Sequence, residues 1–143
     1  SGQLLPQLGR IKLFVLYHAP RDGVALEHSL GLQKGLIGVV HAFADPRQTQ
    51  QNNIVIAHEL LHTLGATDKY AADGRPVYPQ GYAEPDWPEH MPRQEAEIMA
   101  GRYVNAGGKV VMPPGLEQCV IGAQTAHEIN VDEGFRQQYA SSN

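Results

Sequence analysis

Two histidines and a glutamate lie close together in the stretch IAHELLHTLGATDKY, residues 56–70. His58 and His62 are four residues apart, so on a helix they share one face, with Cβ atoms about 5–6 Å apart. Two imidazole nitrogens can then bind one ion at the zinc–nitrogen distance of about 2.0–2.1 Å. Glu59 is one step around the helix, where it can take a proton from a water molecule that the ion activates.

This spacing is uncommon by chance. With the seven histidines and nine glutamates of this chain, random placement gives roughly 0.02 occurrences of the pattern. The plain alternative is a solvated helix face that carries two histidines. A zinc ion held by these residues would lower the pKa of water to about 7 and make hydroxide available at neutral pH. We therefore favour a catalytic metal site.

A catalytic zinc ion needs a third protein ligand and an open position for water. Gly65, three residues after His62, can adopt a positive φ and let the chain turn back sharply at the end of the helix. Asp68 follows three residues later, where its carboxylate can reach the same ion. The sequence therefore predicts that His58, His62 and Asp68 bind the metal.

Other side chains remain open as the third ligand. The candidates all lie in a later segment and are Glu84, Glu89, Glu95, Glu97 and His90. In the gluzincin metalloproteases a glutamate from a later helix completes the site, and by that resemblance the stretch from Glu95 to Glu97 is the most compatible here. Prolines at positions 85, 88 and 92 disfavour a long helix there. Asp68 is therefore the preferred ligand.

The pattern HExxHxxGxxD that begins at His58 resembles the motif of the metzincin metalloproteases. In that family the last histidine is replaced by aspartate in some members, and this form is similar to the small snapalysin-type endopeptidases. The family also carries a methionine in a tight turn beneath the metal. Met99, in the sequence Ile98-Met99-Ala100-Gly101, lies at a suitable place downstream. The resemblance covers roughly 100 residues.

The resemblance implies an α+β fold of the zincin type, in which a small mixed sheet is followed by an active-site helix, the methionine turn and a C-terminal helix. It implies Zn²⁺ as the cofactor, with Glu59 as the general base and a peptide or protein as the substrate. It also favours a secreted or cell-envelope location. The family's substrate-binding edge strand precedes the active-site helix, and residues 36–43 are its candidate here.

Tyrosine side chains in some members of that family stabilise the oxyanion of the reaction. Tyr70, Tyr82 and Tyr103 are near the motif in this sequence. Tyr103 follows the methionine turn and is the preferred candidate. The plain alternative for each is a packed aromatic ring with a solvated hydroxyl group.

The elements that must position these residues follow from the apolar pattern. Residues 11–17 and 36–43 are apolar at most positions and predict two strands. Residues 49–64 have helical spacing, with Thr49, Asn52 and Asn53 available to cap the first turn. The proline-rich segment 71–93 predicts a long irregular loop. A hairpin is expected within residues 104–112, and a capping box at Thr125 predicts a closing helix that includes positions 129–135.

The composition is that of one globular domain formed by residues 1–143, with Ser1 and Gly2 expected to be a remnant of cloning. The formal net charge is −4, and no basic stripe indicates nucleic-acid binding. No apolar run is long enough to span a bilayer. The single cysteine, Cys119, is expected to be a small buried residue rather than a reactive thiol.

These observations predict a zinc-dependent endopeptidase. Two alternatives come from other functional classes. One is a catalytically idle module that keeps the fold for binding, although such a module has no need of Glu59 as a base. The other is a zinc amidohydrolase that acts on a small non-peptide substrate beneath the long loop.

Overall fold

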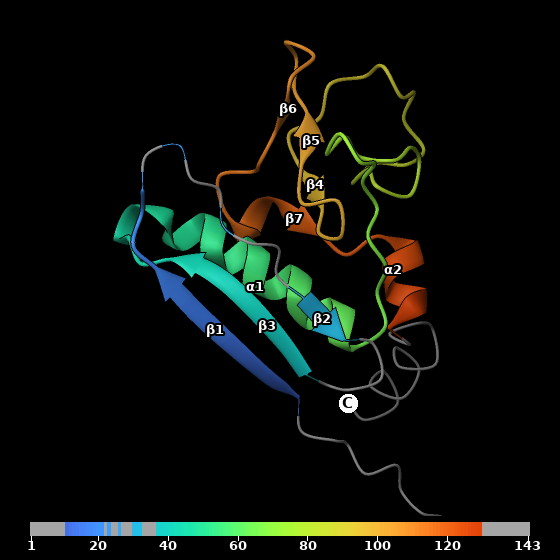
Figure 1. Cartoon of the computed structure of the whole chain (residues 1–143). Helices are drawn as coiled ribbons and strands as arrows, with labels where there is room; N and C mark the ends of the chain where they lie inside the picture. Colours follow the sequence, from blue (N-terminus) through green and yellow to red (C-terminus); the bar gives the residue numbers. More distant parts are fainter. Residues whose placement is uncertain (1–10, 22, 24–25, 27–29, 33–36, 130–143) are drawn as a thin grey trace, which may run out of the picture.

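The computed structural model describes residues 11–21, 23, 26, 30–32 and 37–129. These residues form an α+β structure with one long helix and several small sheets (Figure 1). The elements in chain order are β1 (Lys12–His18), β2 (Leu30–Leu32), β3 (Ile37–Phe43), η1 (Pro46–Gln48), α1 (Thr49–Thr63), β4 (Ala96–Glu97), β5 (Tyr103–Val104), β6 (Val110–Val111), η2 (Leu116–Gln118), β7 (Cys119–Val120) and α2 (Ala123–Glu128).

The largest sheet has the strand order β1-β3-β2. The two predicted strands form β1 and β3, which pair in parallel, while β2 pairs with β3 in the antiparallel direction. The expectation that residues 36–43 form the edge strand is wrong for Ile37–Val39, because these residues pair with β1 on one side and with β2 on the other. At positions 40–43 the pairing among the described residues is with β1 alone, and residue 36 lies outside the described residues. The apolar run of β3 also reflects burial, since Val40 and Ala42 are almost fully buried.

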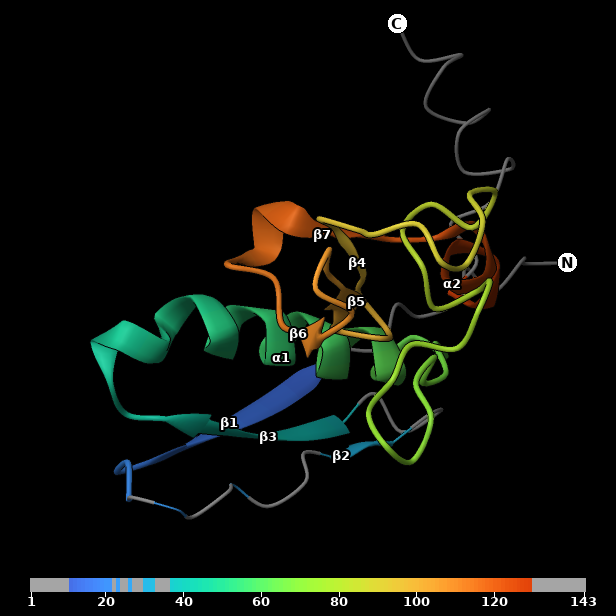
Figure 2. The same cartoon turned by 90° about the horizontal axis from the view of Figure 1, so that it is seen from above.

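Helix α1 is the central layer of the molecule. Its first residues pack close to the end of β3, and the helix then covers one face of the sheet by contacts with β3 and β2. Figure 2 shows the sheet on one side of α1 and the segments from β4 to α2 on the other side. Ile54, Leu61 and Ala66 pack with Ile98 and Met99 in the core between α1 and these later segments.

The start of α1 differs from the predicted capping. Its N-cap residue is Gln48, which makes no side-chain capping bond. The single turn η1 precedes the helix and is itself capped by Asp45, so Thr49 already lies within a continuous spiral of backbone. Asn52 has a different role, because its side chain accepts from the Phe43 N–H at 3.1 Å and donates to the Phe43 carbonyl at 2.8 Å. These two bonds fix α1 to the end of β3.

The end of α1 matches the predicted glycine turn. Gly65 has φ of 110°, a conformation that side-chain-bearing residues rarely adopt. The Gly65 N–H donates to the carbonyl of His62, and the Ala66 N–H donates to the carbonyl of Leu61. These bonds satisfy the last carbonyl groups of the helix and turn the chain back toward its own last turn.

The predicted long loop is present, because residues 71–93 contain no named helix or strand. Arg93 organises its second half from the interior, where only 2% of the residue is exposed. Its guanidinium donates to backbone carbonyls of the loop and lies over two aromatic rings. The carbonyls belong to Glu84, Trp87, Pro88 and Met91, and the rings belong to Tyr82 and Trp87.

The hairpin prediction is confirmed by the antiparallel pair β5 and β6. The capping-box prediction for Thr125 is wrong: α2 begins at Ala123 after the N-cap residue Gly122, and Thr125 lies inside the helix. The Thr125 hydroxyl is needed elsewhere, because it donates to the buried carboxylate of Glu97. The predicted helical positions beyond residue 129 lie outside the described residues. No helix among the described residues is long and apolar enough to cross a bilayer.

Candidate metal centre

Three side chains converge at the end of α1. His58 and His62 lie one turn apart on the helix, and their ring centroids are 4.7 Å apart. Asp68 returns after the Gly65 turn and places Oδ1 at 3.0 Å from His58 Nε2 and at 2.8 Å from His62 Nε2. The structure therefore brings together the three residues that the motif predicts as metal ligands.

Backbone carbonyl groups orient both imidazole rings. His58 Nδ1 is 2.9 Å from the carbonyl oxygen of Ile98, and His62 Nδ1 is 2.7 Å from that of Ala66. A carbonyl oxygen only accepts hydrogen bonds, so each Nδ1 carries the proton. The lone pairs of both neutral rings are then on Nε2, which is the tautomer that metal-binding histidines adopt when a neighbouring group holds the other nitrogen.

This arrangement fits a cation. Two Nε2 lone pairs and a carboxylate oxygen repel one another at 2.8–3.0 Å unless a proton or a metal ion lies among them. Ligands around a tetrahedral zinc ion are roughly 3.3 Å apart when each bond is about 2.0–2.1 Å. Outward movements of a few tenths of an ångström would therefore admit the ion. The nitrogen and carboxylate donors are also those that zinc prefers.

The electrostatics of the centre favour positive charge. Burial by itself would lower the pKa of His58, but the hydrogen bonds to Asp68 and to the Ile98 carbonyl raise it overall. The hydrogen bond from His58 lowers the pKa of Asp68, against the opposing effect of burial. A charged imidazole and an ionised carboxylate are the states that an ion pair stabilises, and a bound cation can replace the proton.

Glu59 lies beside the three converging residues. It is 6% exposed, and its Oε2 atom has no hydrogen-bond partner within the part of the chain that the structure describes. Burial raises the pKa of Glu59, partly offset by the two neighbouring histidines. A buried carboxylate with an unpartnered oxygen is costly, which indicates a chemical role rather than a contribution to stability.

Glu59 is also close enough to be considered as a ligand. One potential ligand atom from each of His58, Glu59 and His62 lies within 4.8 Å of the others. Asp68 is the better third ligand, because a single oxygen atom lies within 3.0 Å of both Nε2 atoms. With Asp68 as the third ligand, Glu59 would flank a bound ion.

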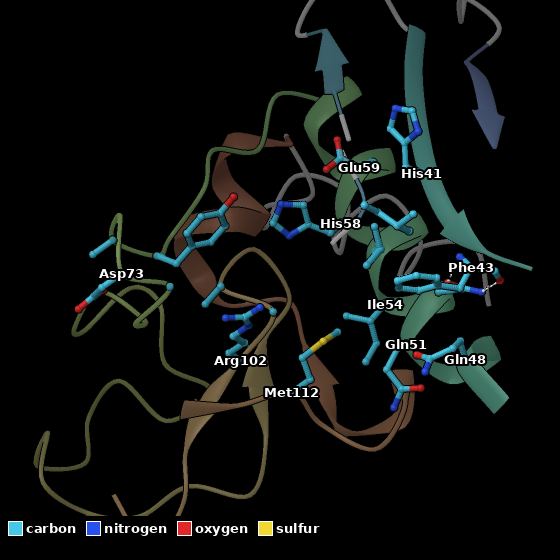
Figure 3. A pocket seen from close by; sticks show the side chains of 18 of the residues that line it. His41, Phe43, Gln48, Gln51, Ile54, His58, Glu59, Asp73, Arg102 and Met112 are labelled. Carbon is cyan, nitrogen blue, oxygen red and sulfur yellow. Dashed lines mark hydrogen bonds between the residues drawn. The ribbon is translucent and has the colours of Figure 1, made fainter. Parts of the chain in front are cut away.

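A cavity of about 600 Å³ opens beside the centre (Figure 3). His58 and Glu59 lie at one part of its wall, and Ile54 and Met112 supply apolar surface farther along. Residues from α1, β3, the 70–74 segment and the 100–102 segment all contribute to the lining. His58 and Glu59 are thus accessible from a space much larger than water, whereas His62 and Asp68 are not among the residues that line it.

The methionine turn lies directly against the metal centre. Met99 is fully buried and packs in the core with Ile54 and Leu61 of α1. The N–H groups of Ala100 and Gly101 both donate to the carbonyl of Glu97, which closes the turn. Because the Ile98 carbonyl accepts from His58, this turn orients one of the candidate ligands.

The tyrosines are placed differently from one another. Tyr103 belongs to β5 and does not line the cavity, whereas Tyr70 lines it together with His58 and Glu59. The ring centroids of Tyr70 and His58 are 6.1 Å apart. Burial raises the pKa of Tyr70, and the negative charge of Asp68 adds to this effect, so the hydroxyl remains a hydrogen-bond donor at neutral pH. The sequence analysis preferred Tyr103, and the signal that could have pointed to Tyr70 is its position two residues after Asp68.

The alternative third ligands have other positions. The Glu97 carboxylate is completely buried and accepts three hydrogen bonds away from the imidazoles. Glu84 pairs with the buried Arg93. The remaining candidates, Glu89, His90 and Glu95, are exposed and do not line the cavity. Cys119 is half-buried, and burial raises its pKa to about 11, as expected for a thiol without a reactive role.

The fold and the site together define an α+β protein with a candidate metal centre of two histidines and an aspartate. Comparisons of the chain with protein-family models, with curated proteins and with solved structures gave no match.

Proposed function

We propose that this protein is a zinc-dependent endopeptidase with a metzincin-like arrangement of its active site. The observation that supports it most directly is the meeting of His58, His62 and Asp68 around one point, with the buried carboxylate of Glu59 beside them. The order of the elements agrees with the resemblance, because the sheet is followed by the active-site helix, the glycine turn, the methionine turn and α2.

Zinc at this position would polarise the scissile carbonyl group and lower the pKa of water. Glu59 accepts a proton from the attacking water and transfers it to the amine nitrogen as the C–N bond breaks. The raised pKa of Glu59 makes its carboxylate a stronger base, and a pKa nearer to the working pH allows the same group to accept a proton and later to donate it. The products are a free carboxylate and a free amine.

We assign to the Tyr70 side chain the stabilisation of the negative charge that develops on the carbonyl oxygen. It lies on the same cavity as His58 and Glu59, and its hydroxyl group is protonated at neutral pH. A hydrogen bond from a hydroxyl group to the oxyanion becomes stronger as negative charge develops on the oxygen. Such a bond therefore lowers the activation barrier of the reaction. We therefore assign to Tyr70 the role that the sequence had suggested for Tyr103.

An extended peptide needs backbone partners as well as a reactive centre. β2 lies at the edge of the three-stranded sheet on the side that contacts α1. An edge strand presents unpaired N–H and C=O groups to which a peptide can add. We assign this role to β2 in place of β3.

The test is Glu59→Gln, which keeps the size of the side chain and removes the base. We expect the variant to bind zinc as the wild type does and to cleave an unstructured protein substrate about 10²–10⁴-fold more slowly. Glu117→Gln is the matched control, because this substitution removes the same charge from an exposed position. Cleavage by the Glu59 variant at the wild-type rate would refute the proposal. Zinc binding without chelator-sensitive cleavage by the wild type would instead indicate a binding module.

A further inference from the structure

Glu97 is the most deeply buried carboxylate among the described residues, with 0% of the residue exposed. Its side chain accepts hydrogen bonds from the Met99 N–H at 2.7 Å, from the Gly122 N–H at 3.1 Å and from the Thr125 hydroxyl at 2.6 Å. Three donors aimed at one carboxylate offset much of the cost of removing it from water. The carboxylate thus joins the methionine turn to the start of α2.

The turn that Glu97 holds contacts the candidate ligand His58 and the residue that follows Asp68. The Ile98 carbonyl accepts from His58 Nδ1 at 2.9 Å. The Met99 carbonyl accepts from the N–H of Lys69, the residue after Asp68, at 3.0 Å. One short segment therefore fixes the ring of His58 and the backbone next to Asp68.

α2 holds the other side of the Asp68 segment. Glu128 Oε2 lies 2.8 Å from Lys69 Nζ and accepts from the Thr67 N–H at 2.9 Å. The Thr67 hydroxyl donates to the second oxygen of Glu128 at 2.8 Å. Thr125 and Glu128 are one turn apart on α2, so this short helix connects the methionine turn to the Thr67 backbone before Asp68 and to the Lys69 side chain after it.

We propose that Glu97 is a positioning residue that sets the metal affinity of the centre through the Met99 N–H and the Ile98 carbonyl. This inference rests on the proposed function. Loss of the Glu97 bonds frees the methionine turn to shift, and with it the acceptor of His58 Nδ1. Partners that act on a ligand in this way change metal affinity by about 10–100-fold.

The test is the zinc affinity of Glu97→Gln, measured by competition with a chromophoric chelator, together with the visible spectrum of the cobalt-substituted protein. Glutamine must present its NH₂ group to one of three donors, so at least one hydrogen bond is lost. We expect about 10–100-fold weaker zinc binding and an altered cobalt spectrum at a temperature where the metal-free variant is folded. Glu95→Gln, an exposed glutamate two residues earlier, is the control and should bind as the wild type does.

Thr125→Val provides a milder variant if Glu97→Gln does not fold. It removes one donor to Glu97 and should weaken zinc binding to a smaller degree in the same direction. A folded Glu97→Gln or Thr125→Val protein with wild-type affinity and an unchanged cobalt spectrum would overturn the positioning role. A wild-type protein that binds no zinc would overturn the proposed function itself, and the positioning role with it.

A separate observation concerns the chemistry of the cavity. Arg102 is the only lysine or arginine among the described residues that line it. It is exposed and makes no hydrogen bond or ion pair with any residue that the structure describes. A Cβ atom at Gly74 would lie 2.8 Å from a guanidinium nitrogen of Arg102, so the glycine leaves room for this side chain.

The other charged groups of the cavity leave this cation available. Asp73 also contributes to the lining, but Figure 3 shows its carboxylate directed away from Arg102 and from His58. Asp73 Oδ1 accepts from the N–H of Arg75 at 3.0 Å. In the view of Figure 3, Met112 and Ile54 lie between Arg102 and the residues from the start of α1, so the cavity offers apolar surface as well as this cation.

We infer that Arg102 selects substrates that present a carboxylate to the cavity, either from an acidic side chain or from the C-terminus of a peptide. This inference also rests on the proposed function. An arginine fork binds a carboxylate through two parallel hydrogen bonds, which gives both affinity and orientation. A charged hydrogen bond of this kind corresponds to roughly a 10–100-fold preference.

The test compares kcat/KM for matched peptides that differ only in Glu, Gln or Lys near the cleaved bond, each with a free or an amidated C-terminus. The wild type should prefer the Glu peptides if Arg102 binds an acidic side chain. It should prefer the peptides with a free C-terminus if Arg102 binds the terminal carboxylate. Arg102→Gln should reduce that preference by about 10–100-fold, whereas Arg75→Gln, an exposed arginine outside the cavity, should leave it unchanged. Equal cleavage of all peptides by the wild type would overturn the assignment of Arg102, and cleavage of none would overturn the proposed function.

Discussion

Two regions of the molecule build the candidate metal centre in different ways. Residues 58–68 supply all three predicted ligands from a single helix end and its turn. Residues 97–128 supply no ligand, yet they fix the ligands through Ile98, Met99 and Glu128. The ligands are therefore local in the sequence, and so is the Ala66 carbonyl that orients His62, whereas the groups that orient His58 and hold the segment around Asp68 come from the distant second region.

The two regions therefore have different roles: the first supplies the candidate ligands and the second orients them. The first region has a spacing that chemistry dictates, because two imidazoles on a helix must be four residues apart to bind the same ion. The second region needs only to present carbonyl and carboxylate oxygens at the right points, and many sequences can do so. We expect substitutions in the first region to abolish metal binding, and substitutions in the second to weaken it or to lower stability.

Asp68→Ala should have the largest effect, because it removes one of three ligands. We expect zinc affinity to fall by more than the roughly 10–100-fold that loss of an orienting partner causes. Metal analysis after dialysis, beside Glu97→Ala, provides the measurement. Retention of zinc by the Asp68 variant and its loss from the Glu97 variant would reverse the assignment of the two regions.

Tyr70→Phe tests whether catalysis also depends on the residues that directly follow the first region. Loss of a hydrogen-bond donor to an oxyanion costs about 10²–10³-fold in kcat. We expect a decrease of that order with zinc content and KM little changed. Tyr103→Phe, in β5 outside the cavity, is the control and should retain kcat. The reverse result would transfer the role to Tyr103.

Gly65→Ala tests the turn that returns Asp68 to the histidines. At φ of 110° a side chain is strained, and the cost is about 1–2 kcal/mol of unfolding free energy. Chemical denaturation should show this decrease, accompanied by weaker zinc binding because the turn and Asp68 move together. Unchanged stability would show that the helix end adapts to a side chain.

Glu128→Gln should have the smallest effect on the free energy of unfolding, and this effect should depend on pH. Burial would raise its pKa, but the hydrogen bonds from Lys69 and Thr67 dominate and lower it to about 2. Its ionised form therefore stabilises the fold above the unfolded pKa of about 4.3, and this contribution is lost as the pH falls from there toward about 2. After allowance for solvent screening, we expect Glu128→Gln to cost about 1 kcal/mol at pH 7.

The measurement is the difference in unfolding free energy between the wild type and Glu128→Gln at pH 7 and at pH 3. The difference should shrink at the lower pH, because the wild-type carboxylate loses its advantage on protonation. A constant difference would show that the bonds to Thr67 depend on shape rather than on charge. In that case the second region would support Asp68 without an electrostatic contribution.

Several predictions from the sequence hold because they depend on local physics. Gly65 ends α1 since the required backbone conformation suits glycine, and the apolar spacing of Ile54 and Leu61 directs one helix face to the core. The failures concern partners that are distant in the chain. Thr125 matched a capping box but donates to Glu97. Residues 36–43 were expected at the edge from their position before the helix, and the short strand β2 pairs with Ile37–Val39.

The sequence by itself determined the three candidate ligands, the base beside them and the turn that joins them, because all five residues lie within eleven positions of one helix and its exit. Only the tertiary structure decided which tyrosine faces the cavity, which carboxylate supports the methionine turn and which arginine reaches the open space. Those choices depend on how separate segments pack against α1, and packing partners leave no fixed spacing in a sequence.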